Sequence, residues 1–540
     1  MTAIGQEHQP GPARPSGWQA AGPLARTSAV AVVGTGTMGQ GIAQVALVAG
    51  HPVRLYDVAP GRAETAAAAI AARLDRLVDK GRMPAAERDA ARARLVPVAE
   101  PAGLAESGLV IEAVLEDLGA KQQLFTALEG IVADDCLLAT NTSSLSVTAV
   151  AGALRRPGRL LGLHFFNPAP LLPLVEVVRG HATEQAAADR AYATAAAWGK
   201  TPVHCADTPG FIVNRVARPF YAEALRLYEE RAADPATIDA VLRESGGFKM
   251  GPFELTDLIG QDVNEAVTRS VWEAFSQDPK FTPSLAQRRL VESGLLGRKS
   301  GHGWFPYAEG AAAPEPHTYE PCEPPAEVTV VGPDDLGPLA VLPELIAAAG
   351  IRVTVADAGE EPTGPAGAYG GYLDLPGGAR LRLADGAPAT PDSDADPAAG
   401  GHPVQIDLAL DYRAATRIAL APSDTAPPEA VRPAVGLFQA LGKKVSVIPD
   451  TPAMIVARTV AMLADFAADA VGRGVAAPGD VDTAMRLGVN YPRGPLEWGD
   501  LLGARWLRTV LGNLHHTCPT GRYAPSRLLA RRAATGGLLL

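Results

Sequence analysis

The stretch SAVAVVGTGTMGQGIAQVALVAGHPVRLYD, residues 28–57, decides the fold of the first third of the chain. Residues 30–33 form a short apolar, mostly β-branched run, which is typical of a buried parallel strand. This run leads directly into a glycine-rich turn, residues 34–39, and then into a helical pattern of apolar side chains. A second strand, residues 52–56, stops at Asp57. The order of strand, glycine turn, helix and strand predicts the start of a doubly wound α/β sheet of the Rossmann type.

The three glycines of this turn suit a dinucleotide, each for a different reason. Gly34 makes the tight turn, Gly36 lets a pyrophosphate approach the backbone, and Gly39 permits close helix packing. The phosphates would then meet free N–H groups at the start of the helix. A glycine-rich turn alone is common, but here Asp57 follows Gly36 by 21 residues, where an acid can bind the ribose hydroxyls. Because a carboxylate repels a 2′-phosphate, the sequence predicts NAD rather than NADP.

Two later strands also end in polar side chains. GLVIEAVLEDLGAKQQLF, residues 108–125, reads as a strand and a helix that place Glu116 and Lys121 within reach of a cofactor. CLLATNTSSLSV, residues 136–147, reads as a strand that ends in three hydroxyl side chains, residues 142–144. Ligands of open α/β sheets bind at the carboxyl ends of the strands, so both strand ends predict site residues.

A histidine and a glutamate stand out in RLLGLHFFNPAPLLPLVEVVRG, residues 159–180. Between residues 160 and 178 they are the only acidic or basic side chains, His164 in the first apolar run and Glu176 in the second. A base that takes a hydroxyl proton, with a buried carboxylate that fixes its tautomer, explains the pair. A core histidine that is merely satisfied by a core glutamate explains it equally well. The spacing leaves both explanations open.

Two further features have an ordinary and a functional interpretation. Residues 61–95 are Ala-rich and helical, and their cations, Arg73 and Lys80 among them, read first as a solvated helix face. Asn214 lies early in a long amphipathic helix after Pro209-Gly210, where asparagine is usually neutral or mildly unfavourable. It is therefore either an exposed asparagine or a functional one.

Composition limits the classes of protein that remain. A chain of 540 residues holds several domains, and its formal net charge of −11 argues against binding to nucleic acid or to anionic membranes. The four cysteines are far apart and predict neither a zinc site nor a disulfide framework, so we expect a reducing, cytoplasmic compartment. Residues 1–27 read as a disordered leader, and no stretch has the length and apolarity of a membrane span.

Five motifs together resemble the L-3-hydroxyacyl-CoA dehydrogenases. They are NTSSLS, GLHFFNPAPLLPLVEVV, DTPGFIVNR, MGPFELTDLIG and GRKSGHGWF, and the resemblance runs through residues 28–307 in one pass. It implies a Rossmann NAD-binding domain at 28–206 and an all-α domain at 207–307. It also implies NAD-dependent oxidation of an (S)-3-hydroxyacyl-CoA to the 3-oxoacyl-CoA, with no metal.

The same resemblance assigns roles to individual residues. It makes His164 the general acid/base, Glu176 its partner, and Ser143 and Asn214 the groups that touch the substrate and hold its reacting oxygen. The cofactor-binding residues that it implies, together with the glycine turn, are Gly34, Gly36, Met38, Gly39, Asp57, Glu116, Lys121, Asn141 and Asn167. Arg73 and Lys80 fall near the helix that binds coenzyme A in the family, although Arg73 stands where a serine is expected.

The rest of the chain reads as a blunted second copy. After a Pro/Ala/Glu-rich linker at 308–326, residues 327–357 repeat strand, turn and helix, but Asp334 replaces the central glycine and opposes a pyrophosphate. A degenerate Rossmann-like domain at 327–449 follows, with a Gly/Pro/Asp-rich stretch at 359–403 that we expect to be loosely structured.

The helical domain is expected to recur at 450–540. DTPGFIVNR at Asp207 returns as DTPAMIVAR at Asp450, 243 residues later, and Asn214 becomes Ala457. The second copy has no base of its own, so we expect a structural role, an internal pseudo-dimer of helical domains; self-association of the chain stays open.

The resemblance leaves the acyl group open. Two-copy chains of this length resemble bacterial 3-hydroxybutyryl-CoA or 3-hydroxyadipyl-CoA dehydrogenases, of fatty-acid β-oxidation or phenylacetate catabolism. A dehydrogenase of free hydroxy or sugar acids, and an NAD-binding sensor without turnover, are the alternatives.

Overall fold

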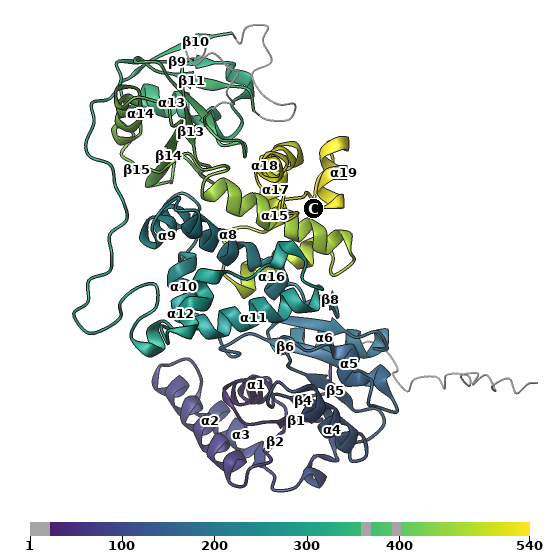
Figure 1. Cartoon of the computed structure of the whole chain (residues 1–540). Coiled ribbons are helices and arrows are strands. Elements are labelled where there is room, and N and C mark those ends of the chain that lie inside the picture. The colour runs from purple at the N-terminus through teal and green to yellow at the C-terminus, as the bar shows by residue number, and fades with distance from the viewer. Residues whose placement is uncertain (1–21, 358–368, 391–400) are drawn as a thin grey trace, which may run out of the picture. The chain divides into compact units, whose positions relative to one another are not determined.

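The computed structural model describes residues 22–357, 369–390 and 401–540, and it divides into two compact units, residues 1–207 and 208–540 (Figure 1). Of the leader predicted for residues 1–27, residues 1–21 lie outside the described residues, whereas residues 22–27 are described and Leu24 is buried in the core of the first unit. Residues 358–368 and 391–400 of the predicted loose stretch also lie outside the described residues.

The first unit is built on an eight-stranded sheet in the order β3-β2-β1-β4-β5-β6-β7-β8. The strands are β1 (Ala29–Val33), β2 (Val53–Tyr56), β3 (Leu95–Pro97), β4 (Ser107–Glu112), β5 (Leu137–Thr140), β6 (Leu160–Phe165), β7 (Leu174–Arg179) and β8 (Thr201–Ala206). Neighbouring strands are parallel except β6 and β7, which are antiparallel. The predicted Rossmann-type sheet is confirmed.

Helices lie on both faces of this sheet. They are α1 (Thr37–Val48), α2 (Arg62–Asp79), α3 (Ala85–Ala93), α4 (Leu118–Glu129), α5 (Val147–Ala151) and α6 (Gln185–Ala197). Val30 and Val32 of β1 join the core with α1, α2 and α6, while the alternate side chains, such as Ala31, are buried on the other face. Strands buried on both faces explain the continuous apolar runs of the sequence.

The strand order places a switch point between β1 and β4. From β1 the sheet grows to β2 and β3 on one side and to β4, β5 and β6 on the other. In such sheets the ligand binds where the order reverses, outside the carboxyl ends of the strands. The turn after β1 and the loops after β4 and β5 therefore form the candidate site.

The second unit begins with helices. They are α7 (Val213–Val216), α8 (Arg218–Glu229), α9 (Pro235–Glu244), α10 (Pro252–Ile259), α11 (Gln261–Ala274) and α12 (Leu285–Glu292). Residues 307–326, all of them described, then run without a helix or strand to β9 (Figure 1).

A mixed seven-stranded sheet follows in the order β10-β9-β11-β12-β13-β14-β15. The strands are β9 (Glu327–Val331), β10 (Arg352–Ala356), β11 (Tyr372–Asp374), β12 (Ala379–Leu383), β13 (His402–Ile406), β14 (Arg417–Pro422) and β15 (Lys444–Val447), with helices α13 (Leu342–Ala348) and α14 (Pro428–Ala440). Between β9 and α13 the glycine turn is replaced by short 3₁₀ turns.

The expectation of loose structure across 359–403 is wrong for part of the described residues. β11 and β12 form an antiparallel hairpin there, and the side chains of β12 alternate between buried and half-buried. The turn between them contains Gly377 and Gly378, both with positive φ. The glycines that suggested disorder thus serve a tight hairpin turn, and the short period-2 pattern beside them decides the structure.

Five more helices complete the chain. They are α15 (Val456–Gly472), α16 (Pro478–Gly488), α17 (Pro495–Leu502), α18 (Ala504–Thr517) and α19 (Arg527–Thr535). The longest of them, α15, packs against α8, α17, α18 and α19, and nearly all of its residues are buried. A helix apolar on all sides has to lie at the centre of its bundle, as α15 does.

Candidate functional site

The glycine turn lies at the switch point and has room for a ligand. Gly34 has φ +93°, and a Cβ there would come within 2.5 Å of the Ala113 carbonyl oxygen. A Cβ on Gly39 would come within 1.9 Å of the Gly34 oxygen, so neither position accepts a side chain. Around a Cβ on Gly36, in contrast, nothing lies within 4 Å, and no side chain caps α1. Open space before uncapped N–H groups fits the pyrophosphate of a dinucleotide.

Asp57 lies where the second strand ends, beside this turn. Its Oδ2 accepts hydrogen bonds from the Thr35 backbone N–H at 2.9 Å and from the Thr35 hydroxyl at 2.7 Å, and its Oδ1 accepts from Ala59. Burial alone would raise the pKa of Asp57, but these hydrogen bonds and the charge of Arg62 lower it overall. The group is therefore a fixed carboxylate, which suits a ribose and opposes a 2′-phosphate.

The second strand end, after β4, holds an ion-pair cluster. Lys121, on α4, is almost wholly buried, and its Nζ lies 2.6 Å from Glu112 and 3.1 Å from Glu116. Glu112 also accepts a hydrogen bond from the Thr140 hydroxyl at 2.7 Å, which ties β4 to β5. Glu112 is not among the residues predicted from the sequence. The one signal for Glu112 in the sequence is its position as an acidic residue at the end of an apolar strand, because a carboxylate buried at such a place needs a cation beside it.

Glu116 organises the hydroxyl-rich loop after β5. It accepts hydrogen bonds from the Thr142 hydroxyl at 2.5 Å and from the backbone N–H groups of Ser143 and Ser144 at 3.1 and 3.2 Å. Burial acts to raise the pKa of Glu116, yet Thr142, Lys121 and Ser144 together lower it. Ser143 is half-buried. The loop is thus held by a carboxylate whose charge is stabilised by its neighbours.

His164 and Glu176 face each other across the antiparallel pair β6–β7. They are direct register partners, and His164 Nδ1 lies 2.6 Å from Glu176 Oε2. Glu176 is fully buried and the His164 side chain is 8% exposed. Nearby, Asn141 holds the strand end by accepting from the Phe165 N–H at 2.9 Å. With Nδ1 engaged by the carboxylate, Nε2 is the nitrogen through which His164 can exchange a proton.

The structure brings Arg73, Lys80 and Asn167 together. They line one cavity of about 400 Å³ with Arg76 and Arg82. Arg73 donates to the Gln40 side chain at 2.6 Å, and Gln40 in turn donates to the Thr35 carbonyl oxygen of the glycine turn. Arg76, Lys80 and Arg82 are exposed, as a solvated face requires, and the same cations border one cavity beside the turn.

Met38 and Asn214 complete the predicted set. Met38, in the first turn of α1, packs against the apolar core. Asn214 lies in the second unit, on α7. It is half-buried, whereas all the remaining residues from 211 to 220 are buried.

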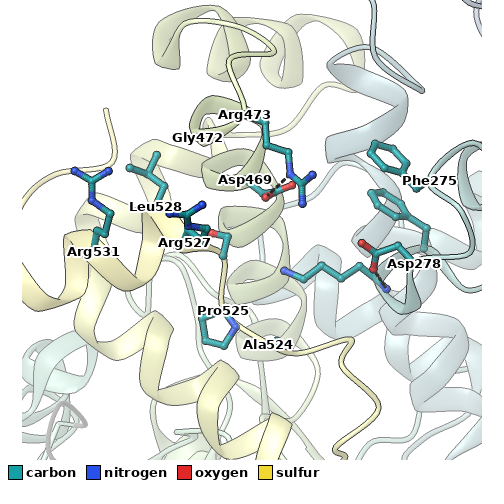
Figure 2. A pocket seen from close by; sticks show the side chains of 13 residues that line it. Phe275, Asp278, Asp469, Gly472, Arg473, Ala524, Pro525, Arg527, Leu528 and Arg531 are labelled. Atoms are coloured by element: carbon teal, nitrogen blue, oxygen red, sulfur yellow. Dashed lines mark hydrogen bonds and ion pairs between the residues drawn. The ribbon is translucent and has the colours of Figure 1, made fainter.

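The second unit has a larger cavity that contains none of the predicted residues. It measures about 610 Å³ and is lined by residues from the segments 275–281, 469–473 and 524–531. Figure 2 shows Asp469 of α15 paired with Arg473, which directly follows that helix, and Arg215 reaches the same carboxylate at 2.7 Å. Asp469 is thus shared by two arginines.

Neither a metal cluster nor a membrane-spanning helix is found in residues 22–357, 369–390 and 401–540. No group of three or more metal-ligating side chains is present among them. No helix in this part of the chain has the length and apolar character needed to cross a membrane.

Three family models match the chain. The "3-hydroxyacyl-CoA dehydrogenase, NAD binding domain" matches residues 29–208. The "3-hydroxyacyl-CoA dehydrogenase, C-terminal domain" matches residues 210–307 and 454–538. The "3-hydroxybutyryl-CoA dehydrogenase reduced Rossmann-fold domain" matches residues 381–452.

Whole proteins are similar over most of their length. A 3-hydroxyadipyl-CoA dehydrogenase of Escherichia coli (strain K12) is 42% identical over 93% of this chain and 97% of its own length. A crystal structure called 3-hydroxybutyryl-CoA dehydrogenase, also from Escherichia coli K12, has a TM-score of 0.83 and 41% identity, covering 95% of this chain and 99% of that one. A 3-hydroxybutyryl-CoA dehydrogenase of Mycobacterium tuberculosis (strain ATCC 25618 / H37Rv) is 40% identical over 52% of this chain and 98% of its own length.

The glycine turn, the strand-end acid and the matched domain model agree on the cofactor, so the first unit binds NAD. By its domain models and by identity over nearly its whole length, the chain belongs to the 3-hydroxyacyl-CoA dehydrogenase family.

Proposed function

We propose that the protein oxidises (S)-3-hydroxyacyl-CoA to 3-oxoacyl-CoA, with His164 as general acid/base and Glu176 as its partner. The buried hydrogen bond of 2.6 Å between them carries the proposal. The carboxylate keeps the proton on Nδ1, so Nε2 can take the C3 hydroxyl proton, and it stabilises the imidazolium that forms. Bound NAD supplies the hydride acceptor.

Further residues have proposed positioning roles. The Ser143 hydroxyl and the Asn214 amide hold the C3 oxygen, as preorganised polar groups stabilise developing charge. Glu116 supports the Ser143 loop through the hydrogen bonds described above. The residues proposed to bind or support the cofactor are Gly34, Gly36, Gly39, Met38, Asp57, Asn141, Lys121 and Asn167.

The cationic cavity of α2 is the proposed site for the phosphates of coenzyme A. Arg73 and Lys80 line it with two further arginines. Guanidinium and ammonium groups gathered at one cavity suit phosphate oxygens, which accept several charge-assisted hydrogen bonds. The Arg73 guanidinium is tied to the glycine turn through Gln40, so the thioester and the cofactor would be held on one framework.

The second helical set is proposed to duplicate the first, with domains at 28–206, 207–307, 327–449 and 450–540 and a linker at 308–326. Helix starts support it, since Pro235 and Pro478, and likewise Pro252 and Pro495, are 243 residues apart. Two carboxylates at equivalent positions also support the duplication. Asp239 accepts from the Phe253 and Glu254 N–H groups, and Asp482 from those of Leu496 and Glu497, all at 2.9 Å.

Ion pairs support an internal pseudo-dimer of the two sets. Arg215 of the first set binds Asp469 of the second at 2.7 Å, and Arg458, which is 243 residues after Arg215, binds Glu230 of the first at 2.7 Å. The arginines are equivalent by the 243-residue offset, and their carboxylates are 239 residues apart, about one helical turn from exact equivalence, so the contacts fit an approximate two-fold interface. Asn214 is replaced by Ala457 in the second set, so its proposed role is structural. A cytoplasmic location stays a prediction.

NADH consumption tests the reaction. Acetoacetyl-CoA, 3-oxoadipyl-CoA and free acetoacetate are compared on the wild type and on His164→Ala. Turnover of a thioester that the variant loses supports the proposal, whereas turnover of the free acid alone points to a hydroxy-acid dehydrogenase. Tight NAD binding without turnover of any substrate points to a sensor.

A further inference from the structure

Arg218 differs from every other buried arginine of the described chain. Six arginines are at most 6% exposed, and five of them have a carboxylate oxygen within 4 Å. The pairs are Arg159–Glu129, Arg215–Asp469, Arg417–Glu244, Arg458–Glu223 and Arg522–Glu223. Arg218 has no carboxylate partner among the described residues. A buried cation without a counter-ion is costly, so its presence calls for a reason.

The protein neighbours of Arg218 leave donors unused. Its Nη1 donates to the Thr268 hydroxyl at 3.0 Å, and its guanidinium lies 4.9 Å from the centre of the Tyr221 ring. Its Nε has no hydrogen-bond partner among the described residues. Burial raises the pKa of Tyr221, so this phenol stays neutral and does not balance the charge. The guanidinium is held in place from two sides, and no described residue supplies an anion for its charge.

A second unused donor belongs to the same cluster. Tyr491 is 6% exposed, its hydroxyl has no partner among the described residues, and its ring lies 5.6 Å from that of Phe220, two residues after Arg218. Burial raises its pKa well above the ordinary value, so the hydroxyl keeps its proton and can donate it to an anion. Tyr491 comes from the second helical set, between α16 and α17.

Helix geometry places Arg218 beside Asn214. The two are four residues apart, and Ala217 between α7 and α8 keeps right-handed helical angles, φ −77° and ψ −11°. The break comes from Pro219, which has no N–H to continue the helical hydrogen bonds. Side chains at i and i+4 lie on one face, with Cβ atoms about 6 Å apart. Long helical side chains also lean toward the N-terminus, here toward the turn that carries Asn214.

We propose that Arg218 binds the distal carboxylate of the acyl group, so that the preferred substrate is a dicarboxylic 3-hydroxyacyl-CoA. The proposal rests on the proposed function, in which Asn214 holds the C3 oxygen. In a six-carbon diacid the carboxylate carbon lies three carbon–carbon bonds from C3, about 4 Å, which is the scale of the step from Asn214 to Arg218. Tyr491 donates a second hydrogen bond to the same carboxylate.

Two six-carbon thioesters test it, 3-oxoadipyl-CoA with the carboxylate and 3-oxohexanoyl-CoA without it. The wild type is expected to have a higher kcat/KM for 3-oxoadipyl-CoA. In Arg218→Met, which keeps the length and loses the charge, the ratio of the two kcat/KM values should fall by about 100-fold, mainly through KM for the diacid. Arg218→Lys should restore part of the ratio, and Tyr491→Phe should lower it by about 10-fold.

Stability separates this role from a structural one. Arg218→Met removes an unpaired buried charge, so its Tm should equal or exceed that of the wild type. The matched control is Arg215→Met, three residues earlier, which should lower Tm because Asp469 loses its buried partner. An equal loss on both thioesters, or an unchanged ratio in Arg218→Met, overturns the proposal. A wild type that turns over neither thioester refutes the proposed function instead, and an unchanged ratio in Tyr491→Phe removes Tyr491 from the site.

Discussion

His164 and Glu176 are direct partners in the antiparallel register of β6 and β7, with Nδ1 and Oε2 2.6 Å apart and the carboxylate fully buried. Two strands thus place the imidazole opposite the carboxylate, and the ring of Phe166, the first residue of the following turn, lies 4.5 Å from that of His164. The turn of eight residues between the strands, 166–173, carries Asn167 and other residues that line the cationic cavity, while the register of the strands sets the geometry of the pair.

Replacing Glu176 with Gln should therefore lower kcat by at least about 100-fold, because an amide cannot stabilise the imidazolium. NAD affinity should stay near the wild-type value, since the substitution is remote from the glycine turn. Steady-state kinetics and NADH titration measure both. The control is Asp189→Asn, which alters an exposed carboxylate 4.0 Å from His204 and should leave kcat unchanged. Equal activity of Glu176→Gln and wild type would remove Glu176 from the mechanism.

Two glycines of the turn should respond differently to alanine. A Cβ on Gly36 points into open space, so Gly36→Ala should fold with an unchanged Tm while KM for NAD rises by about 10-fold or more. A Cβ on Gly39 meets the Gly34 oxygen at 1.9 Å, so Gly39→Ala should lower Tm as well. Thermal unfolding and NAD titration distinguish the two. Normal NAD binding by Gly36→Ala would contradict the proposed place of the pyrophosphate.

Replacing Asp57 with Ala should shift the preference between cofactors. The loss of the ribose acceptor should lower kcat/KM for NAD by about 10-fold or more, and the loss of the charge should raise the relative rate with NADP. Arg62, which lies 3.9 Å from Asp57, then has no carboxylate beside it and can meet a 2′-phosphate. Paired assays with NAD and NADP measure the ratio. A ratio equal to that of the wild type argues against Asp57 as the selecting residue.

The cationic cavity predicts a selective effect on the thioester. Arg73→Ala and Lys80→Ala should each raise KM for acetoacetyl-CoA by about 10-fold with little change in KM for NAD, since each removes one charge from the cavity. Arg88→Ala is the matched control, because Arg88 lies on the neighbouring α3 and pairs with Asp75 and Asp89 outside the cavity. Similar KM values in all four proteins would place coenzyme A elsewhere.

Glu223 should make the second unit sensitive to acid. Burial opposes its charge, but Arg522 and Arg458 bind it and lower its pKa to about 2. Because the folded pKa lies below the ordinary 4.5, the stabilisation is complete above about pH 4.5 and is lost as the pH falls toward 2. Glu223→Gln should cost about 3 kcal/mol near pH 7, and its Tm deficit should shrink below pH 4.5.

The control for that experiment is Glu344→Gln. Glu344 pairs with Arg413 at the surface, where both side chains are more than half exposed, so its Tm should match the wild type. A deficit of Glu223→Gln that stays constant between pH 7 and pH 3 would show that the carboxylate is not ionised by its arginines.

Much of the fold could be predicted because its determinants are local. Strand, glycine turn and helix follow one another within residues 28–57, and the structure confirms each of them as β1, the turn and α1. The hairpin of β11 and β12 was missed because its strands are short and stand among glycines and prolines, which also mark disorder. A pattern of three to five residues is too short to outweigh that composition.

The candidate site was predictable in its members but only partly in its contacts. The strand-end residues Glu116, Lys121 and Ser143 were named from the sequence, since parallel strands present their carboxyl ends at one edge. Glu112, which binds Lys121, was not, because its importance depends on being buried beside a cation nine residues along the chain. Local periodicity does not reveal such a pairing.

The sequence by itself determined the NAD-binding turn, the family and the recurrence of short sequence motifs at a spacing of 243 residues, because each is written in contiguous residues. Only the tertiary structure decided which buried charges are paired. Arg215 and Arg218 lie three residues apart, yet one meets Asp469 from 254 residues away and the other meets no carboxylate in the described chain. A buried arginine is paired only if the tertiary packing brings a distant carboxylate into the same low-dielectric interior, and local sequence does not show which carboxylate that is.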